Sequence, residues 1–358
     1  MSRIKVLHQV LDPTGSGGVS AEFRALDNSL LSKDHDFESM ILYHPHKWIN
    51  LRDIYFYYKH IVNEKPDIIH IRGAAADGLN AIIAARVYGK AKILVVVHGM
   101  VSDSVYISKI KRWVYRNIVE YLSFTLCDGI SCVCERISQR DYFKKYKEKM
   151  LPYVYNRMPS FDDSKYLIYR SEIRKEYDIK DDDVVFAYIG RLSREKGLDI
   201  LFEALDIIHD DLPDNFVLLI VGGGDYYQHC VDMYSDCSYR VVFTDNQSNT
   251  ERFFRAADVF ISPSLHENHS IALLEACSAA LPCVVTDCGG NRETISNGQT
   301  GIIVPVGDAY QLSLAIKKML DPKNREFYRC NLKHYDFSDF SDEACDRALD
   351  NVYKMLMI

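Results

Sequence analysis

The sequence predicts an α/β protein with two Rossmann-like domains facing across a cleft, each a parallel sheet covered by helices on both faces. Three observations support this prediction. Strands and helices alternate along the chain, the strands are near-continuous apolar runs, and the alternation starts again near residue 183. Strands of a parallel sheet look this way because both of their faces are buried. We expect domains over residues 1–160 and 161–337, and a C-terminal helix over 338–358.

The first half of the chain contains one complete series of these elements. Apolar runs predict the strands, and apolar residues repeating about every 3.6 positions predict the helices between them. A Gly-rich turn separates the first strand from the first helix, and a basic helix precedes the last strand. We expect strands over residues 4–10, 67–71, 92–98 and 129–133, with helices over 20–32 and 75–88.

The second half repeats the pattern after a connection at residues 152–169. It contains no low-complexity segment and no short-period repeat, so a second domain of the same class is the simplest reading. We expect strands over residues 183–190, 216–221, 240–243 and 258–262, helices over 197–209 and 250–257, and a further helix from residue 271.

Length and composition agree with a two-domain globular protein, since 47% of the 358 residues are hydrophobic. No apolar run approaches the roughly 18 residues that a membrane-spanning helix needs. The N-terminal residues lead directly into a strand and lack a signal-peptide pattern. The ten cysteines form no C-x-x-C pair, which favours reduced, buried thiols. Together these features predict a cytoplasmic protein.

The net charge of −7 is unevenly distributed, because residues 1–155 carry +6 and the remainder carries −13. Much of the positive excess lies in residues 107–118 and 144–149, where basic side chains alternate with Ile110, Trp113 and other apolar ones. Such a mixture suits an anionic membrane surface, and it also suits a helix packed on the core with a solvated basic face. Nucleic acid is not an expected partner, because the pI is near 6.0 and no reader motif occurs.

Two carboxylates, Glu267 and Glu275, flank the join between the strand 258–262 and the following helix. Since a helix rises about 1.5 Å per residue, Glu275 should lie one to two turns inside it, while Glu267 stays in the preceding turn. The N–H groups of the first helical turn favour a phosphate, and carboxylates suit hydroxyl donors. This geometry predicts a ligand with sugar, diphosphate and ribose in a row.

Two glutamates at this spacing also occur as a solvated turn residue and a helix-surface acid, so the residues that follow are needed to decide. They include a Leu-Pro-x-Val-Val strand from Leu281, a Gly-Gly-x-x-Glu turn from Gly289, and a Gly-x-x-x-Pro loop from Gly301. In order and spacing, these motifs resemble the C-terminal signature of the family 4 retaining glycosyltransferases of GT-B fold. The chain departs from the family at Ala280, where Gly is usual, and in Phe243-Thr244-Asp245, where the family usually has Gly after the Phe.

The segment from Gly190 to Gly197 carries two cations between the end of a strand and the start of a helix. Cations at the carboxyl end of a parallel strand suit a diphosphate. Taken alone, Arg191 and Lys196 would more often be surface charges. The segment is similar to the family's Gly-Arg-Leu…Lys-Gly element, which implies that both residues stabilise the leaving group.

In the first half, the turn Gly15-Ser-Gly17-Gly18 follows the first strand and allows backbone amides to approach a phosphate or sugar. It nearly matches the dinucleotide fingerprint, although Ser20 takes the last glycine position. The resemblance instead implies that Gly17 and Gly18 meet the donor diphosphate. It also implies that His98 faces the donor sugar, whereas His70 is either a core or an acceptor-side residue.

The resemblance therefore implies catalytic roles for His98, Arg191, Lys196 and Glu267. The residues implied for donor binding are Gly17, Gly18, Arg191, Lys196, Asn268, His269, Ser270, Ile271 and Glu275. No Asp-x-Asp motif and no His/Cys/Asp cluster at ligand spacing occurs in a suitable loop, so neither a metal nor a cofactor is expected. The expected donor is a UDP- or GDP-linked sugar.

The resemblance implies a retaining glycosyltransferase that acts on a saccharide or lipid-linked saccharide, and the missing metal-ligand motifs predict that it needs no metal. The resemblance implies a role in bacterial polysaccharide or glycan assembly at the inner face of the membrane. It also implies that the final helix packs back on the N-terminal domain. Three alternatives remain open. They are an epimerase or phosphorylase of the same fold, an NAD-dependent oxidoreductase using the turn before Ser20, and a catalytically silent scaffold, against which the intact Glu267 and Lys196 argue.

Overall fold

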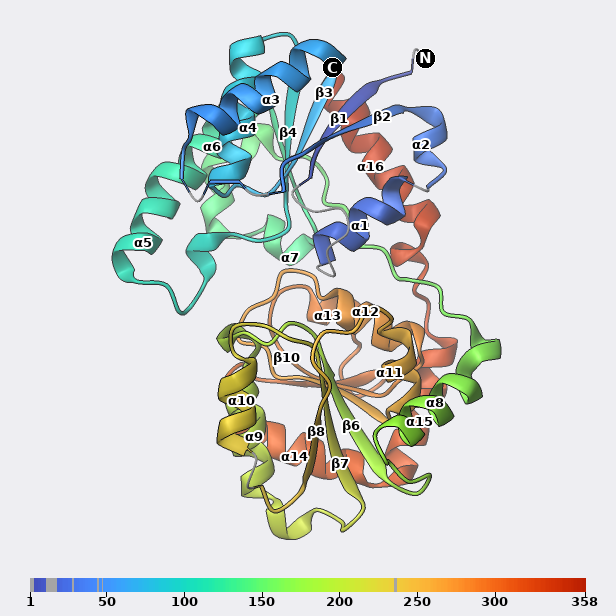
Figure 1. The fold of residues 1–358 in the computed structure, drawn as a ribbon. Helices are drawn as coiled ribbons and strands as arrows, with labels where there is room; N and C mark the ends of the chain where they lie inside the picture. The colour runs from blue at the N-terminus through green and yellow to red at the C-terminus, as the bar shows by residue number, and fades with distance from the viewer. Residues whose placement is uncertain (1–2, 11–17, 28, 44, 47, 235–236) are drawn as a thin grey trace. The chain divides into compact units, whose positions relative to one another are not determined.

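The computed structural model describes residues 3–10, 18–27, 29–43, 45–46, 48–234 and 237–358. The chain divides into two compact units (Figure 1), one of Met1–Arg157 with Ser338–Ile358 and one of Met158–Phe337. Each unit is built on one parallel sheet with helices, which confirms the predicted α/β class.

The first unit contains a five-stranded sheet in the order β2-β1-β3-β4-β5. All of its neighbouring strands run parallel, and the order reverses between β1 and β3. Loops that leave a parallel sheet on either side of such a reversal form the usual ligand crevice. The strands are β1 Lys5–Val10, β2 Asp36–Ile41, β3 Ile68–Arg72, β4 Lys92–Val97 and β5 Gly129–Cys132.

Helices and short turns connect these strands. The predicted helix over 20–32 is in fact two helices, and the predicted basic helix contains a π-helical segment at Tyr115–Val119. The helices of the first unit are α1 Gly18–Asp27, α2 Leu31–Asp34, α3 Leu51–Glu64, α4 Ala76–Tyr88, α5 Lys109–Val114, α6 Glu120–Leu126, α7 Glu135–Ser138 and α16 Asp342–Met357.

Neither β2 nor α3 was predicted from the sequence. β2 is an edge strand in which only Met40 is buried, so it lacks the continuous apolar run of a central strand. In α3 the buried positions are Asp53, Tyr57 and Ile61. One acid among three buried residues hides the apolar period that identifies a helix.

The last helix, α16, packs in the first unit beside β4 and α2 (Figure 1). Ser341 caps its N-terminus by accepting a hydrogen bond from the N–H of Ala344 at 3.3 Å. Val352 and Leu356 are buried in the same core cluster as strand residues of β1, β3 and β4. The helix also carries Asp346, whose Oδ1 lies 2.7 Å from Nη2 of Arg157. Arg157 is the last residue of the N-terminal segment of this unit.

The second unit contains a six-stranded parallel sheet in the order β11-β10-β9-β6-β7-β8, which reverses between β6 and β9. The strands are β6 Val184–Ile189, β7 Phe216–Val221, β8 Arg240–Phe243, β9 Val259–Ser262, β10 Cys283–Thr286 and β11 Gly301–Val304. The helices are α8 Tyr166–Glu176, α9 Leu198–Ile207, α10 Tyr227–Tyr234, α11 Glu251–Ala256, α12 Ile271–Ser278, α13 Asn291–Thr294, α14 Ala309–Leu320 and α15 Pro322–His334.

Two hydrophobic clusters cover the two faces of this second sheet. Phe186 and Leu218 belong to one cluster, and their neighbours Val185 and Val217 belong to the other. Since successive side chains of a strand point to opposite faces, both sets must be apolar. This is why the strands read as unbroken apolar runs.

Candidate functional site

The reversal of strand order between β6 and β9 brings together the two loops that carry most of the predicted site residues. One loop leaves β6 and runs to Gly197, and the other leaves β9 and runs to Ser270. Both begin at the carboxyl ends of neighbouring parallel strands, where ligands of open α/β sheets bind. The site in the second unit is therefore built at this position.

Gly197 allows these two loops to touch through their backbones. A Cβ atom at this position would lie 2.2 Å from the carbonyl oxygen of Pro263, and the φ of Gly197 is +68°. The N–H of Leu265 donates to the carbonyl of Glu195 at 2.8 Å. Only glycine meets both requirements, because it has no Cβ and adopts positive φ without strain.

This backbone contact places Lys196 beside Glu267. The Lys196 Nζ lies 2.5 Å from Glu267 Oε1, and Ser264 Oγ donates to the same carboxylate oxygen at 2.9 Å. The two charged side chains remain 21% and 14% exposed, so a ligand can reach both. Ser264 is completely buried, and no sequence pattern singled it out.

The predicted Gly-Gly turn supports the same loop from the other side. A Cβ on Gly289 would lie 2.5 Å from the carbonyl oxygens of both Glu267 and Asn268, and the φ of Gly289 is +50°. The N–H of Gly290 donates to the carbonyl of Asn268 at 2.6 Å. The Gly-Gly turn therefore acts on the site through the backbone that carries Glu267.

The start of α12 can meet a ligand through its backbone rather than its side chains, in keeping with the predicted role of its N–H groups. The side chains of Asn268, His269 and Ser270 are buried, with 8%, 6% and 7% of their surface exposed. Ser270 Oγ caps the helix by accepting from the N–H of Leu273, and burial lowers the pKa of His269 to about 3. What this segment offers a ligand is thus its backbone, including the N–H of Ile271, which precedes the first intrahelical hydrogen bond.

Glu275 occupies the second turn of α12, where it is partly buried. Its Oε1 accepts a hydrogen bond from Thr250 Oγ1 at 2.9 Å. Burial raises the pKa of Glu275 to about 7, although the bond from Thr250 acts in the opposite direction. Thr250 lies 25 residues away in sequence, and no pattern identified it.

Arg191 is exposed and follows Gly190 at the end of β6. Its carbonyl accepts a hydrogen bond from the Tyr188 hydroxyl at 2.9 Å. The loop after β7 packs against this segment, because a Cβ on Gly222 would lie 2.1 Å from the carbonyl oxygen of Gly190. The backbone of Arg191 is therefore held while its guanidinium group remains in solvent.

The two segments that depart from the family pattern each contain a residue with the same backbone feature. Asp245 has a φ of +55° and Ala280 a φ of +50°, both in the left-handed region. Glycine is favoured there because side chains with a Cβ are strained. Asp245 also hydrogen-bonds through Oδ1 to the N–H of Asn246 at 2.7 Å, a local bond that makes this conformation accessible to aspartate.

In the first unit, Gly17 lies outside the described residues and Gly18 is the first residue of α1. His98 follows β4 at its carboxyl end. Burial, together with the charge of Arg72, lowers the pKa of His98 to about 3, so the ring is neutral near pH 7. His98, His70 and Arg72 influence one another electrostatically.

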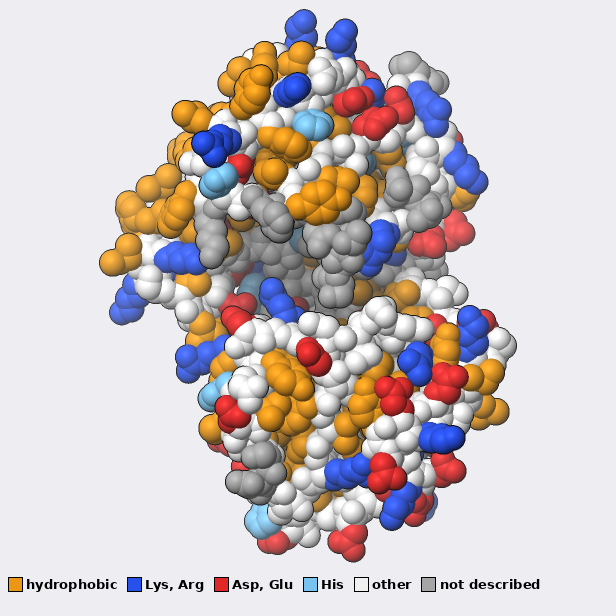
Figure 2. Space-filling view, viewed as in Figure 1, with side chains coloured by type: hydrophobic (Ala, Val, Ile, Leu, Met, Phe, Trp, Pro, Cys, Tyr) orange, Lys and Arg blue, Asp and Glu red, His pale blue; other side chains and the backbone are white. Residues whose placement is uncertain are grey.

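Of the two segments predicted to meet a membrane, one has exposed side chains, and the other contains a lysine that is hydrogen-bonded within the protein. No residue of α5 is buried, and Ile110 and Trp113 are 78% and 60% exposed. In Figure 2, hydrophobic and basic side chains lie next to one another over this helix. In 144–149, however, Lys149 donates to three carbonyls at the end of α6, of which Thr125 is the nearest at 2.6 Å. Among the described residues, no helix is long and apolar enough to cross a membrane.

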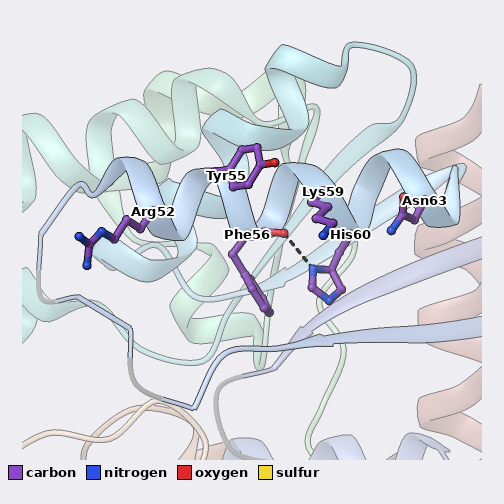
Figure 3. Close-up of a pocket in the computed structure, with 6 residues that line it drawn as sticks. All are labelled: Arg52, Tyr55, Phe56, Lys59, His60 and Asn63. Atoms are coloured by element: carbon purple, nitrogen blue, oxygen red, sulfur yellow. Dashed lines mark hydrogen bonds between the residues drawn. The ribbon is translucent and has the colours of Figure 1, made fainter.

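A separate shallow pocket lies on the outer face of α3 and contains none of the predicted site residues (Figure 3). It is lined by Arg52, Tyr55, Phe56, Lys59, His60 and Asn63. His60 Nδ1 bonds the carbonyl of Phe56 one turn earlier at 2.8 Å. All six residues come from one exposed helix, so this pocket gives no support for a second catalytic centre.

Comparisons with known proteins relate both units to one class of enzyme. A family model described as glycosyl transferases group 1 matches residues 169–331, and one described as Glycosyltransferase Family 4 matches residues 25–148. The chain is 26% identical over 281 residues to the UDP-Gal:alpha-D-GlcNAc-diphosphoundecaprenol alpha-1,3-galactosyltransferase of Escherichia coli. That alignment covers 76% of this chain and 71% of the Escherichia coli enzyme.

Two further likenesses agree. The chain is 23% identical over 304 residues to the capsular polysaccharide biosynthesis glycosyltransferase CapM of Staphylococcus aureus, covering 82% of this chain and 78% of CapM. The crystal structure of Anabaena HepE in complex with UDP and glucose matches with a TM-score of 0.76 at 17% identity. That match covers 98% of this chain and 100% of HepE, and it supports the same fold.

Proposed function

The chain belongs to the family 4 glycosyltransferases (group 1) of GT-B fold, and from this we propose the reaction that it catalyses. The enzyme transfers a sugar from a UDP- or GDP-linked donor to a saccharide or lipid-linked saccharide. The sugar keeps its anomeric configuration, and the reaction needs no metal ion. The observation that carries the proposal is the position of Lys196 and Glu267 beside the start of α12, with Glu275 one turn further. Two carboxylates, a lysine and a helix N-terminus match the parts of a nucleotide diphosphate sugar.

Each group has a role in this reaction. The bond from the anomeric carbon to the β-phosphate oxygen breaks, and the carbon bonds to the acceptor hydroxyl oxygen. Arg191, Lys196 and the first-turn amides of α12 stabilise the charge that develops on the departing diphosphate. Glu267 accepts hydrogen bonds from donor-sugar hydroxyls, and Glu275 accepts them from the ribose.

The acceptor proton needs a destination, and no described side chain was identified as a nucleophile or strong base. We place the attack on the face of the sugar from which the diphosphate leaves, so that a phosphate oxygen of the donor takes the proton. The neutral ring of His98 is proposed to contact the donor sugar near the reacting carbon. Activity that persists in excess EDTA is the expected sign of metal independence.

Thermal unfolding in the presence of UDP, GDP, ADP, their sugar conjugates and NAD tests the donor assignment. A ligand at 100 times its Kd stabilises a protein by about 2.7 kcal/mol. We expect a shift with one nucleoside diphosphate that is lost in Glu275→Ala. A shift with NAD alone would contradict the proposal and favour an oxidoreductase.

The affinity for that nucleoside diphosphate should depend on pH through Glu275. The pKa of this carboxyl is raised to about 7, and the ribose hydroxyls bind its ionised form. We therefore expect Kd to rise by up to about tenfold per pH unit below 7 and to level off above it. In the free protein the sign is opposite: a raised carboxyl pKa stabilises the fold at low pH, and this stability is lost as pH rises through 7.

Calorimetric titrations between pH 5.5 and 8.5, in wild type and Glu275→Gln, measure this dependence. The glutamine variant keeps the size of the side chain and its bond from Thr250 but does not titrate. Any pH dependence of Kd that remains in this variant therefore reports the titration of the ligand's own phosphate. Identical pH profiles in the two proteins would exclude Glu275 as the ribose ligand.

We also propose that α5 brings the enzyme to an anionic membrane. Ile110 and Trp113 are exposed beside Lys109 and Lys111, a pattern suited to the interface of an anionic bilayer. We expect co-sedimentation with phosphatidylglycerol vesicles at low salt, weaker binding at high salt, and little binding to phosphatidylcholine. The double variant Ile110→Ser with Trp113→Ser should lose it, whereas Val87→Ser, an exposed apolar position on α4, should not. If wild type does not co-sediment with phosphatidylglycerol vesicles at low salt, the membrane proposal is refuted.

A further inference from the structure

A polar cluster interrupts one face of the sheet in the first unit. His8 of β1 and His70 of β3 are register partners, and their ring centres lie 4.9 Å apart. Arg72 comes two residues after His70 and therefore lies on the same face of β3. His8 and His70 are only 1% and 3% exposed, so the cluster is internal rather than a solvated surface.

Neighbouring groups hold Arg72 in a defined orientation. Its Nη1 donates to Nδ1 of His8 at 3.0 Å, and its backbone N–H donates to Gln9 Oε1 at 3.3 Å. The guanidinium carbon lies 5.2 Å from the ring centre of Phe23. For His8 to accept at Nδ1 it must be neutral, and burial together with the charge of Arg72 lowers its pKa well below the usual value.

Hydrogen bonds orient Arg72, whereas its charge is not paired within the part of the chain that the structure describes. Among the described residues it forms no ion pair, and its Nε is buried without a hydrogen-bond partner. Glu22, whose charge acts on Arg72, is bonded to Arg157 at 3.1 Å. Removing a cation from water without a counter-charge is costly, so such an arrangement is expected where a ligand supplies the anion.

We propose that Arg72, oriented by His8, forms an anion site at the carboxyl end of β3 that takes a phosphate group of the acceptor. A guanidinium group suits this role because its N–H groups match two phosphate oxygens at once. The existence of the site stands on the contacts above. Its assignment to the acceptor rests on the proposed function, and it is supported by the diphosphate-linked acceptor in the name of the Escherichia coli relative.

The test uses inorganic pyrophosphate as the probe and protein already saturated with the nucleoside diphosphate that the donor panel identifies. Saturation occupies the donor site, so that calorimetry reports binding elsewhere. We expect wild type to bind pyrophosphate and Arg72→Met to bind it at least tenfold more weakly, with nucleotide affinity unchanged. The Tm of Arg72→Met should equal or exceed that of wild type, because the substitution removes a cation that pairs with no carboxylate of the described residues.

Arg52→Met is the matched control. It removes the same charge from the exposed face of α3, where Arg52 lines the pocket described above. Its pyrophosphate affinity should equal that of wild type, and a loss there would assign the binding to α3 and overturn the proposal. For the orienting residue, His8→Asn keeps an acceptor and should retain binding, whereas His8→Phe should weaken it several-fold.

Four results would overturn the site. They are no pyrophosphate binding by wild type, unchanged binding by Arg72→Met, a parallel loss of nucleotide affinity in Arg72→Met, and a fall in its Tm with both affinities retained. The third would place Arg72 in the donor site and the fourth would make it structural. If wild type binds no nucleotide, the proposed function is contradicted instead. A pyrophosphate titration of the protein without nucleotide then still tests the Arg72 site.

Discussion

Lys196→Ala is expected to lower kcat by about 100-fold or more, the usual effect of removing one preorganised charge stabiliser. The Lys196 Nζ is 2.5 Å from Glu267 Oε1, so the lysine side chain is held in place before the donor binds. In the proposed mechanism, Lys196 is a cation that the β6 and β9 loops jointly hold near the departing diphosphate. KM should change much less than kcat, because the charge it neutralises develops in the transition state.

The measurement is release of nucleoside diphosphate from the sugar conjugate that the thermal panel identifies. Lys317→Ala provides the control, since Lys317 also belongs to the second unit and pairs with Asp211 at 2.7 Å on the surface. It should retain wild-type kcat. A kcat for Lys196→Ala within a few-fold of wild type would remove Lys196 from the proposed mechanism.

Gly197→Ala is expected to damage both folding and activity. The φ of Gly197 is +68°, and a Cβ would lie 2.2 Å from the carbonyl oxygen of Pro263. The left-handed conformation alone costs about 1–2 kcal/mol for alanine, and the overpacking adds about 1–3 kcal/mol. Relieving the clash must separate the two loops, and so must separate Lys196 from Glu267. We therefore expect kcat/KM to fall at least tenfold.

Gly298→Ala separates these two effects. Gly298 has a φ of +80°, but a Cβ there meets nothing within 4 Å. This variant should show the conformational cost alone in urea unfolding and should keep full activity. If the two variants lose equal stability and Gly197→Ala remains fully active, the close approach of the loops is not what positions Lys196.

The strand pattern was largely predictable, because it depends on local periodicity. Most central strands are mainly apolar, since both faces of the sheet are covered, and the predicted strand boundaries differ from the observed ones by at most two residues. β2 and α3 were not predicted, because an edge strand and a helix with a buried acid lack this pattern. The departures at Ala280 and in Phe243-Thr244-Asp245 could be seen in the sequence, but the positive φ that Ala280 and Asp245 share could not.

The sequence by itself determined the α/β class, the repeated series of elements and the order of the motifs that contain Lys196, Glu267 and Glu275. These depend on side-chain period and turn chemistry, which are local properties of a chain. Only the tertiary structure decided which groups meet across long separations: Lys196 with Glu267, Thr250 with Glu275, and His8 with Arg72. The physical reason is that such contacts are set by strand order and by backbone approaches such as that of Gly197 to Pro263, which no local pattern encodes.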